Sequence, residues 1–109
     1  AMEASIPAIW VIMDNSAFGT IAGLENAKYQ CTFGCEFLRN GEPYIVDYPA
    51  VARAHGANGI DIKAADELIP ALEMALHSDL PTVIRVPMEN IATPTPGHWN
   101  INDIYRNGQ

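Results

Sequence analysis

Oxygen-bearing side chains collect in one short stretch of the sequence, directly after an apolar run. Asp14, Asn15 and Ser16 follow residues 9–13 without a spacer and offer a carboxylate, an amide and a hydroxyl group. Gly19 lets the backbone pass close to a bound group, because glycine carries no Cβ. Open α/β sheets bind ligands beyond the carboxyl ends of their strands, which is where these side chains would lie. We therefore treat this stretch as the candidate site, although Asp-Asn after a strand is also an ordinary turn opening.

Three strands are predicted to position this site. Residues 9–13 are all apolar and include β-branched side chains, which predicts a strand covered on both faces. Residues 60–63 alternate between isoleucine and charged side chains, which is typical of a strand that is half exposed to water. Pro81 opens the last predicted strand, over residues 82–86.

Helices are predicted between these strands. One follows Gly19, over residues 20–24, and a second begins at Asp47, a good N-cap, and ends at Gly56. A third covers residues 65–77, where Pro70 predicts a kink or a separate first turn. The core-facing stripe expected on this third helix is Leu68, Ile69, Leu72, Ala75 and Leu76. This element order predicts an α/β fold with three αβα layers, a mostly parallel sheet and right-handed crossovers.

The segment from residue 25 to residue 48 shows little periodicity and is expected to be a long, partly irregular connection. Cys31 and Cys35 lie within it. A metal site would need further ligands nearby, and a disulfide is not expected in a cytoplasmic chain, so both residues are interpreted as small apolar side chains. Phe33, Glu36 and Phe37 either contact substrate or, equally well, anchor the loop.

Composition narrows the class of protein. The 109 residues fit one domain of common size, and the net charge of −7 argues against nucleic acid as a partner. The sequence contains no apolar run of membrane-spanning length and no signal-peptide pattern at its start, so we expect a cytoplasmic protein with no membrane contact.

Several motifs carry a family resemblance. The octapeptide D-N-S-A-F-G-T-I at residues 14–21 resembles the second half of the metal and cofactor motif of thiamine-diphosphate-dependent enzymes, the acetolactate synthase and benzoylformate decarboxylase group. Four further stretches are similar, in order, to the C-terminal part of that family's cofactor domain. They are T-F-G-C-E-F, V-D-Y-P-A-V-A-R-A-H-G-A, D-E-L-I-P-A-L and P-T-V-I-R-V-P.

The resemblance implies thiamine diphosphate and Mg²⁺ as cofactors. Asn15 would bind the metal through its side-chain oxygen and Ala17 through its carbonyl. Phe18, Gly19 and Thr20 would lie against the cofactor, and Ile21 would face its reacting end. The family's Gly-Asp-Gly segment does not occur in these residues, so only half of such a site is expected here. The chain is then expected to begin within a domain and to work with the remainder of the same enzyme and with a second subunit, as a homodimer or homotetramer.

The implied reaction acts on a 2-oxo acid, as a carboligase or decarboxylase of the lyase or transferase classes, with this chain alone inactive. No catalytic residue is assigned, because the glutamate that activates the cofactor in this family belongs to a partner subunit. Ile21 stands where pyruvate decarboxylases carry a catalytic glutamate, which favours carboligation or an unusual hydrolysis. The T-F-G-C-E-F stretch resembles the trihydroxycyclohexanedione hydrolases in particular, so this hydrolase is an alternative activity. A non-catalytic α/β interaction module is the alternative from another class.

Residues 1–90 are thus expected to form the C-terminal part of the thiamine-diphosphate-binding domain, and residues 91–109 a tail. Pro94, Pro96 and Gly97 prevent regular structure in the tail. The tail either folds over the active site as a lid, where His98 would approach substrate, or docks on the surface. Without its neighbouring segment, the strand at residues 9–13 would expose an apolar edge, so the chain alone is expected to be poorly soluble.

Overall fold

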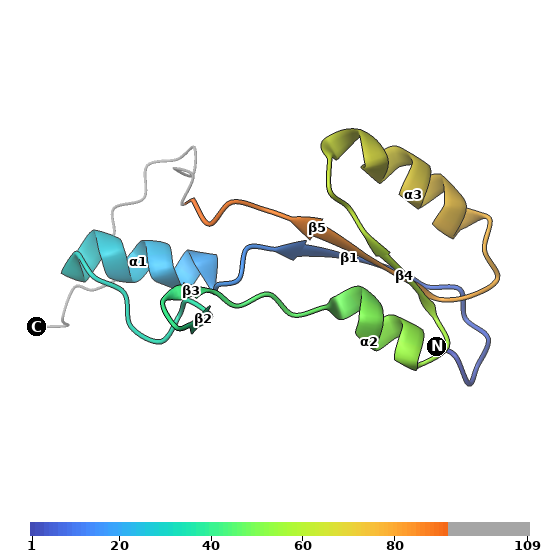
Figure 1. The fold of residues 1–109 in the computed structure, drawn as a ribbon, viewed down its shortest axis with the longest axis horizontal. Coiled ribbons are helices and arrows are strands. Elements are labelled where there is room, and N and C mark those ends of the chain that lie inside the picture. The colour runs from blue at the N-terminus through green and yellow to red at the C-terminus, as the bar shows by residue number, and fades with distance from the viewer. Residues whose placement is uncertain (92–109) are drawn as a thin grey trace, which may run out of the picture. The chain divides into compact units, whose positions relative to one another are not determined.

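A computed structural model describes residues 1–91 of the chain (Figure 1). They belong to two compact units, which we describe separately. The first unit contains Ala1–Asp14 and Val46–Met88, and the second contains Asn15–Ile45 and residues 89–91. Within the part of the chain that the structure describes, no helix is long and apolar enough to cross a membrane.

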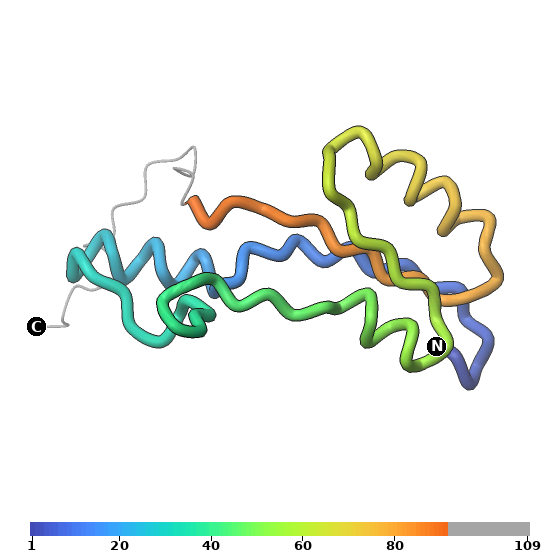
Figure 2. Tube along the Cα trace, in the orientation of Figure 1, coloured from blue at the N-terminus to red at the C-terminus, as the bar shows by residue number. Residues whose placement is uncertain are grey.

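The first unit is built on a parallel sheet of three strands. They are β1 (Ile9–Asp14), β4 (Asn58–Asp61) and β5 (Thr82–Pro87), in the spatial order β1-β5-β4. Although β5 is the last of these three strands in the sequence, it lies between the other two, as the trace in Figure 2 lets the reader follow. Thr82 is in register with both Ile9 and Asn58. The predicted α/β fold with a mostly parallel sheet is confirmed.

Helices cover both faces of this sheet (Figure 1). Helix α3 (Leu68–Leu76) packs on one face, where Ala71 and Ala75 form a buried cluster with Ile84 of β5. Helix α2 (Tyr48–Ala54) packs on the other face, close above Gly59 of β4. Because side chains alternate along a strand, Gly59 and Ile84 belong to opposite faces. The three layers are therefore αβα, as the sequence predicts.

The ends of these helices follow the predicted signals. Asp47 caps α2 by accepting a hydrogen bond from the Ala50 amide at 2.9 Å, and Gly56 follows the helix with φ +82°. A separate 3₁₀ turn, η1 (Ala65–Glu67), precedes α3. This is the predicted interruption before Pro70, whose ring nitrogen cannot donate to the carbonyl of Asp66.

Two burial predictions are wrong. Trp10, Val11 and Met13 of β1 are 48%, 44% and 66% exposed, so this strand is not covered on both faces. The reason is its position at the edge of the sheet, since α2 packs over β4 and β5 and α3 over β5.

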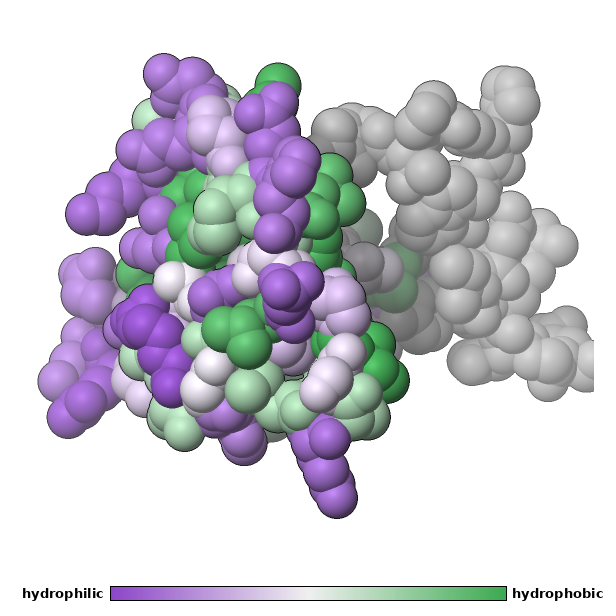
Figure 3. Space-filling view, turned by 90° about the vertical axis from the view of Figure 1, so that its right-hand side faces the viewer, coloured by the Kyte–Doolittle hydropathy of each residue, from purple (hydrophilic) through white to green (hydrophobic). Residues whose placement is uncertain are grey.

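Ile69 and Leu76 of α3 point to solvent, because Ala71 and Ala75 occupy the face toward the sheet. Figure 3 shows such apolar side chains at the surface among polar ones.

The second unit contains a helix and a hairpin. Helix α1 (Gly19–Tyr29) is longer than the predicted segment 20–24 and ends at Gln30. Strands β2 (Leu38–Arg39) and β3 (Glu42–Pro43) pair in antiparallel fashion. The intervening turn has φ +55° and φ +82° at its two residues, Asn40 and Gly41. The connection expected between residues 25 and 48 is therefore partly regular. Residues 92–109, with His98 and the proposed lid, lie outside the described residues.

Candidate functional site

The polar corner after β1 is a tight turn closed by Asn15. The Asn15 side chain accepts a hydrogen bond from the Ala17 amide through Oδ1, at 3.2 Å. Ser16, between them, adopts φ +54°, a left-handed conformation that is unfavourable for residues with a Cβ. All three residues are half-buried. A backbone in this region is costly and persists where the surrounding contacts hold it in place.

Ala17 also pairs with the T-F-G-C-E-F segment. It lies opposite Glu36 in an isolated antiparallel bridge. The structure thus brings together two stretches that the sequence analysis considered separately. The two hydrogen bonds that form this bridge run from the Phe37 amide to the Ser16 carbonyl at 2.8 Å and from the Phe18 amide to the Cys35 carbonyl at 2.7 Å.

This pairing determines where the polar groups of Ala17 point. The two bonds flank the Ala17–Glu36 pair, so the amide and carbonyl of Ala17 itself face away from Glu36. The Ala17 amide is bonded to Asn15, and in extended backbone the carbonyl of a residue lies on the same edge as its amide. The Asn15 side-chain oxygen and the Ala17 carbonyl oxygen therefore lie along one edge of the chain.

Gly19 lets the start of α1 approach this turn closely. A Cβ on Gly19 would lie 2.7 Å from Nδ2 of Asn15, which is shorter than any normal contact. Phe18, the N-cap residue, gives α1 no side-chain cap, and Thr20 and Ile21 in the first turn are exposed. Uncapped amides at a helix N-terminus attract anions such as phosphate groups.

Side chains of the T-F-G-C-E-F segment hold the pairing in place. The Glu36 carboxylate accepts hydrogen bonds from the Thr32 hydroxyl at 3.0 Å and from the Asn90 amide at 3.1 Å. Phe37 packs edge-to-face on Phe18, with ring centroids 4.9 Å apart. The Phe37 side chain therefore anchors this loop to the turn, and the Glu36 side chain ties the loop to Asn90, whereas Phe33 is 89% exposed.

The two cysteines differ. Cys31 is exposed, whereas Cys35 is buried, and both thiols are free. Cys35 Sγ donates to the Glu25 carboxylate at 3.2 Å, and the same Glu25 oxygen accepts the Phe33 amide at 2.8 Å. The Phe33 amide, followed by the Cys35 thiol, holds the pKa of Glu25 below its usual value. Burial, followed by the hydrogen bond to Glu25, raises the pKa of the Cys35 thiol. Within residues 1–91, no group of three His, Cys, Asp or Glu side chains could hold a metal ion.

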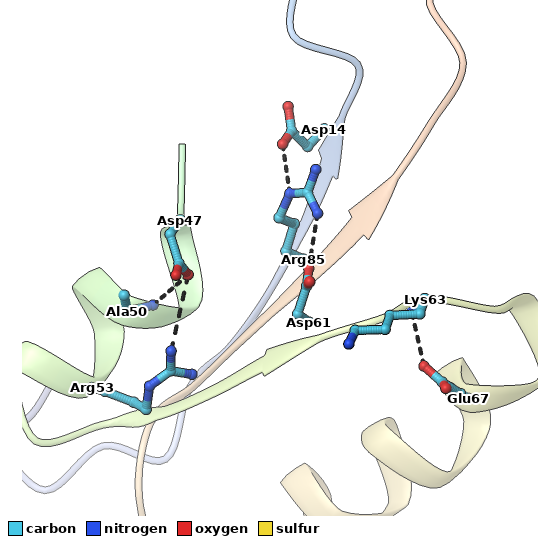
Figure 4. Close-up of polar contacts among 8 residues, drawn as sticks. All are labelled: Asp14, Asp47, Ala50, Arg53, Asp61, Lys63, Glu67 and Arg85. Atoms are coloured by element: carbon cyan, nitrogen blue, oxygen red, sulfur yellow. Dashed lines mark hydrogen bonds and ion pairs between the residues drawn. The ribbon is translucent and has the colours of Figure 1, made fainter. Parts of the chain in front are cut away.

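An ion-pair network that the sequence analysis missed lies in the first unit, at the carboxyl ends of its strands. Arg85 of β5 donates from Nε to Asp14 of β1 at 2.6 Å and from Nη1 to Asp61 of β4 at 2.9 Å (Figure 4). The two hydrogen bonds, with that to Asp14 the stronger, raise the pKa of the Arg85 guanidinium. The signal in the sequence was an arginine inside the apolar strand V-I-R-V-P, which requires acidic partners.

Comparisons with known proteins find relatives that match most of this chain. Among curated proteins, the chain is 37% identical over 97 residues to the putative thiamine pyrophosphate-containing protein YdaP of Bacillus subtilis, a match covering 89% of this chain and 16% of that protein. It is 31% identical over 94 residues to 3D-(3,5/4)-trihydroxycyclohexane-1,2-dione hydrolase of Listeria innocua, covering 84% and 15%. It is 35% identical over 81 residues to the catabolic acetolactate synthase of Raoultella terrigena, covering 74% and 13%.

The chain thus spans about a sixth of the length of these relatives. Residues 1–86 match the family model described as thiamine pyrophosphate enzyme, C-terminal TPP binding domain. The matched range includes the corner at Asn15, the loop that pairs with it and the strand that carries Arg85. This match shows that the chain belongs to the thiamine pyrophosphate enzymes, with residues 1–86 in their C-terminal TPP binding domain.

Proposed function

We propose that this chain supplies half of a Mg²⁺ and thiamine diphosphate site in an enzyme that joins or cleaves carbon–carbon bonds of 2-oxo acids, in the manner of acetolactate synthase. The observation that carries the proposal is the shared edge formed by Asn15 Oδ1 and the Ala17 carbonyl oxygen. Two oxygens two residues apart on one edge match the ligand arrangement implied by the family resemblance.

The donor set suits magnesium. Mg²⁺ takes hard oxygen ligands in octahedral geometry and commonly shares them with phosphate groups. An amide oxygen has two lone pairs, and the Ala17 amide uses one of those on Asn15, so the other is available to a metal. Both ligands are neutral. The negative charge that balances the ion then comes from the diphosphate and from residues outside this chain, as a shared site requires.

The start of α1 suits the diphosphate. The first-turn amides at Gly19, Thr20 and Ile21 lack a side-chain cap from Phe18, and anionic oxygens satisfy such amides well. Bound thiamine diphosphate supplies a nucleophilic carbon for bond-making and bond-breaking next to a carbonyl group. Ile21 offers no proton to the reacting end of the cofactor, which favours carbon–carbon bond formation over protonation.

The metal assignment is tested in the complete enzyme by measuring the affinity for Mn²⁺, in the presence of thiamine diphosphate, by electron paramagnetic resonance. We expect Asn15→Ala to weaken Mn²⁺ binding by about 10-fold or more, because it removes an oxygen ligand. Asn15→Asp keeps an oxygen at the same place and serves as the matched control, with binding retained. Unchanged Mn²⁺ affinity in Asn15→Ala would refute the assignment.

Trihydroxycyclohexanedione hydrolase is the second candidate activity. It is supported by the 31% identity to the Listeria innocua hydrolase and by the pairing of the T-F-G-C-E-F loop with Ala17. Assays of the complete enzyme with pyruvate and with the cyclic dione separate the two activities. Formation of acetolactate supports the first, and ring opening of the dione supports the second. Family membership favours either enzyme over a non-catalytic module. A homodimer or homotetramer, a cytoplasmic location and an inactive isolated chain stay predictions.

A further inference from the structure

Within the second unit, a side chain from beyond β5 reaches the start of α1. Asn90 belongs to this unit, and its side-chain nitrogen Nδ2 donates to the Glu36 carboxylate at 3.1 Å. Its side-chain oxygen Oδ1 lies 3.7 Å from the place that a Cβ on Gly19 would occupy. Because Asn90 is an exposed residue, burial of apolar surface does not account for this position.

Two hydrogen bonds fix which end of each amide group lies against Gly19. An ionised carboxylate only accepts hydrogen bonds, so Glu36 receives the NH₂ group of Asn90 and leaves the oxygen of Asn90 toward Gly19. The Ala17 amide only donates, so Asn15 turns its oxygen to Ala17 and its NH₂ group to Gly19, 2.7 Å from the same Cβ position. An acceptor and a donor from two side chains therefore lie against one glycine.

We propose that Asn90 is a positioning residue for the proposed metal ligand Asn15, and that Glu36 orients Asn90 for this role. This inference rests on the proposed function. The partial negative charge on the oxygen of Asn90 favours the NH₂ group of Asn15 beside Gly19 and keeps the oxygen of Asn15 on the opposite side. That side is the edge shared with the Ala17 carbonyl oxygen. Groups that orient a metal ligand without touching the metal commonly change metal affinity when they are replaced.

The test measures Mn²⁺ affinity in the complete enzyme by electron paramagnetic resonance with thiamine diphosphate present, together with thermal unfolding. We expect Asn90→Ala to weaken Mn²⁺ binding by about 10-fold and to leave the unfolding temperature close to that of the parent, because the residue is exposed. If Asn90 acts through Asn15, its replacement costs nothing further once that ligand is gone. A double variant with both replaced by alanine should therefore bind Mn²⁺ within about threefold of Asn15→Ala.

Substitutions around the carboxylate separate its two hydrogen bonds. Glu36→Ala removes the acceptor for Asn90 and should weaken Mn²⁺ binding about as much as Asn90→Ala does. Glu36→Gln keeps an acceptor oxygen and should restore most of the affinity. Thr32→Val is the matched control, because it removes the 3.0 Å bond from the Thr32 hydroxyl to the same carboxylate and leaves the bond from Asn90. We expect Thr32→Val to keep Mn²⁺ affinity within about threefold of the parent.

Three results would overturn the inference. They are parent-like Mn²⁺ affinity in Asn90→Ala, a loss in the double variant that equals the product of the two single losses, and equal losses in Thr32→Val and Glu36→Ala. If Asn15→Ala weakens Mn²⁺ binding and Asn90→Ala does not, only the positioning role fails. If Asn15→Ala itself has no effect, the proposed function fails, and this inference fails with it.

Discussion

A Cβ placed on Gly59 would lie 2.2 Å from the carbonyl oxygen of Pro49. Helix α2 therefore approaches β4 so closely that only glycine fits between them. We expect Gly59→Ala to destabilise the protein by about 1–3 kcal/mol, because the backbone of α2 must move to relieve the collision. Chemical denaturation followed by circular dichroism measures this loss.

Gly34→Ala is the control for this substitution. Gly34 has φ +69°, but nothing lies within 4 Å of the position its Cβ would occupy. Its replacement should therefore show only the conformational cost of a left-handed alanine, about 1–2 kcal/mol. A Gly59→Ala protein as stable as the parent would contradict the close packing of α2 on β4.

The cap of α2 can be tested at Asp47. Asp47→Ala removes the acceptor for the Ala50 amide and should lower the free energy of unfolding by about 1 kcal/mol. Asp47→Asn keeps an acceptor oxygen and should change it by only a few tenths. The 4.0 Å ion pair between Asp47 and Arg53 is exposed and adds little. Equal losses in both variants would show that charge, and not the cap, is the important property.

The two thiols should react at different rates. In a Cys31→Ser variant, the remaining Cys35 should react with Ellman's reagent on the order of tenfold more slowly than Cys31 does in a Cys35→Ser variant. The reason is that Cys35 is 2% exposed and its thiol pKa is raised by burial. The rates are read from absorbance at matched pH. Equally fast labelling of both thiols would refute the buried position of Cys35.

Glu25 should make stability depend on pH in the acid range. Hydrogen bonds from the Phe33 amide and then the Cys35 thiol lower the pKa of Glu25 in the folded protein below its ordinary value of 4.5. The unfolded chain then binds the proton more readily, so the stabilisation is present above pH 4.5 and is lost as the pH falls through the folded pKa. Glu25→Gln should lack this component. Parallel unfolding-versus-pH curves for parent and variant would contradict the assignment.

The exposed edge strand should promote self-association of the isolated chain. Within residues 1–91, β1 is paired on one side, and its Val11 and Met13 are 44% and 66% exposed. A lysine at an edge strand opposes pairing with another strand, so Val11→Lys should reduce concentration-dependent association in sedimentation velocity. Ile69→Lys, on the exposed face of α3, adds the same charge elsewhere and should reduce association less.

The sequence predicted the elements whose signals are local. The apolar run of β1, the Asp47 cap and the break before Pro70 each depend on a few neighbouring residues, and each is found in the structure. The extent of α1 was missed because it ends at Gln30, which takes φ +58° in place of the usual glycine. The hairpin at Asn40 and Gly41 was missed although Asn-Gly is a strong hairpin signal, since its strands have only two residues each.

Contacts between distant residues could not be predicted in this way. Arg85 is 71 residues from Asp14 and 24 from Asp61 in the sequence. The three side chains come together because β5, which carries Arg85, lies between β1 and β4 in the sheet. Burial of residues 9–13 depended likewise on where the helices cross the sheet. The corner at Asn15 was located from its residue types, while its link to Glu36 required the fold.

The register of β5 has a consequence for folding errors. Arg85 and its neighbour Ile84 project to opposite faces, so a shift of the strand by one residue would exchange a guanidinium for an isoleucine. The arginine would then enter the apolar cluster around Ala71 and Ala75, where the cluster supplies no carboxylate. Folding intermediates with this shifted register are therefore higher in free energy than the native alignment. The carboxylates of Asp14 and Asp61 thus favour the native register of all three strands.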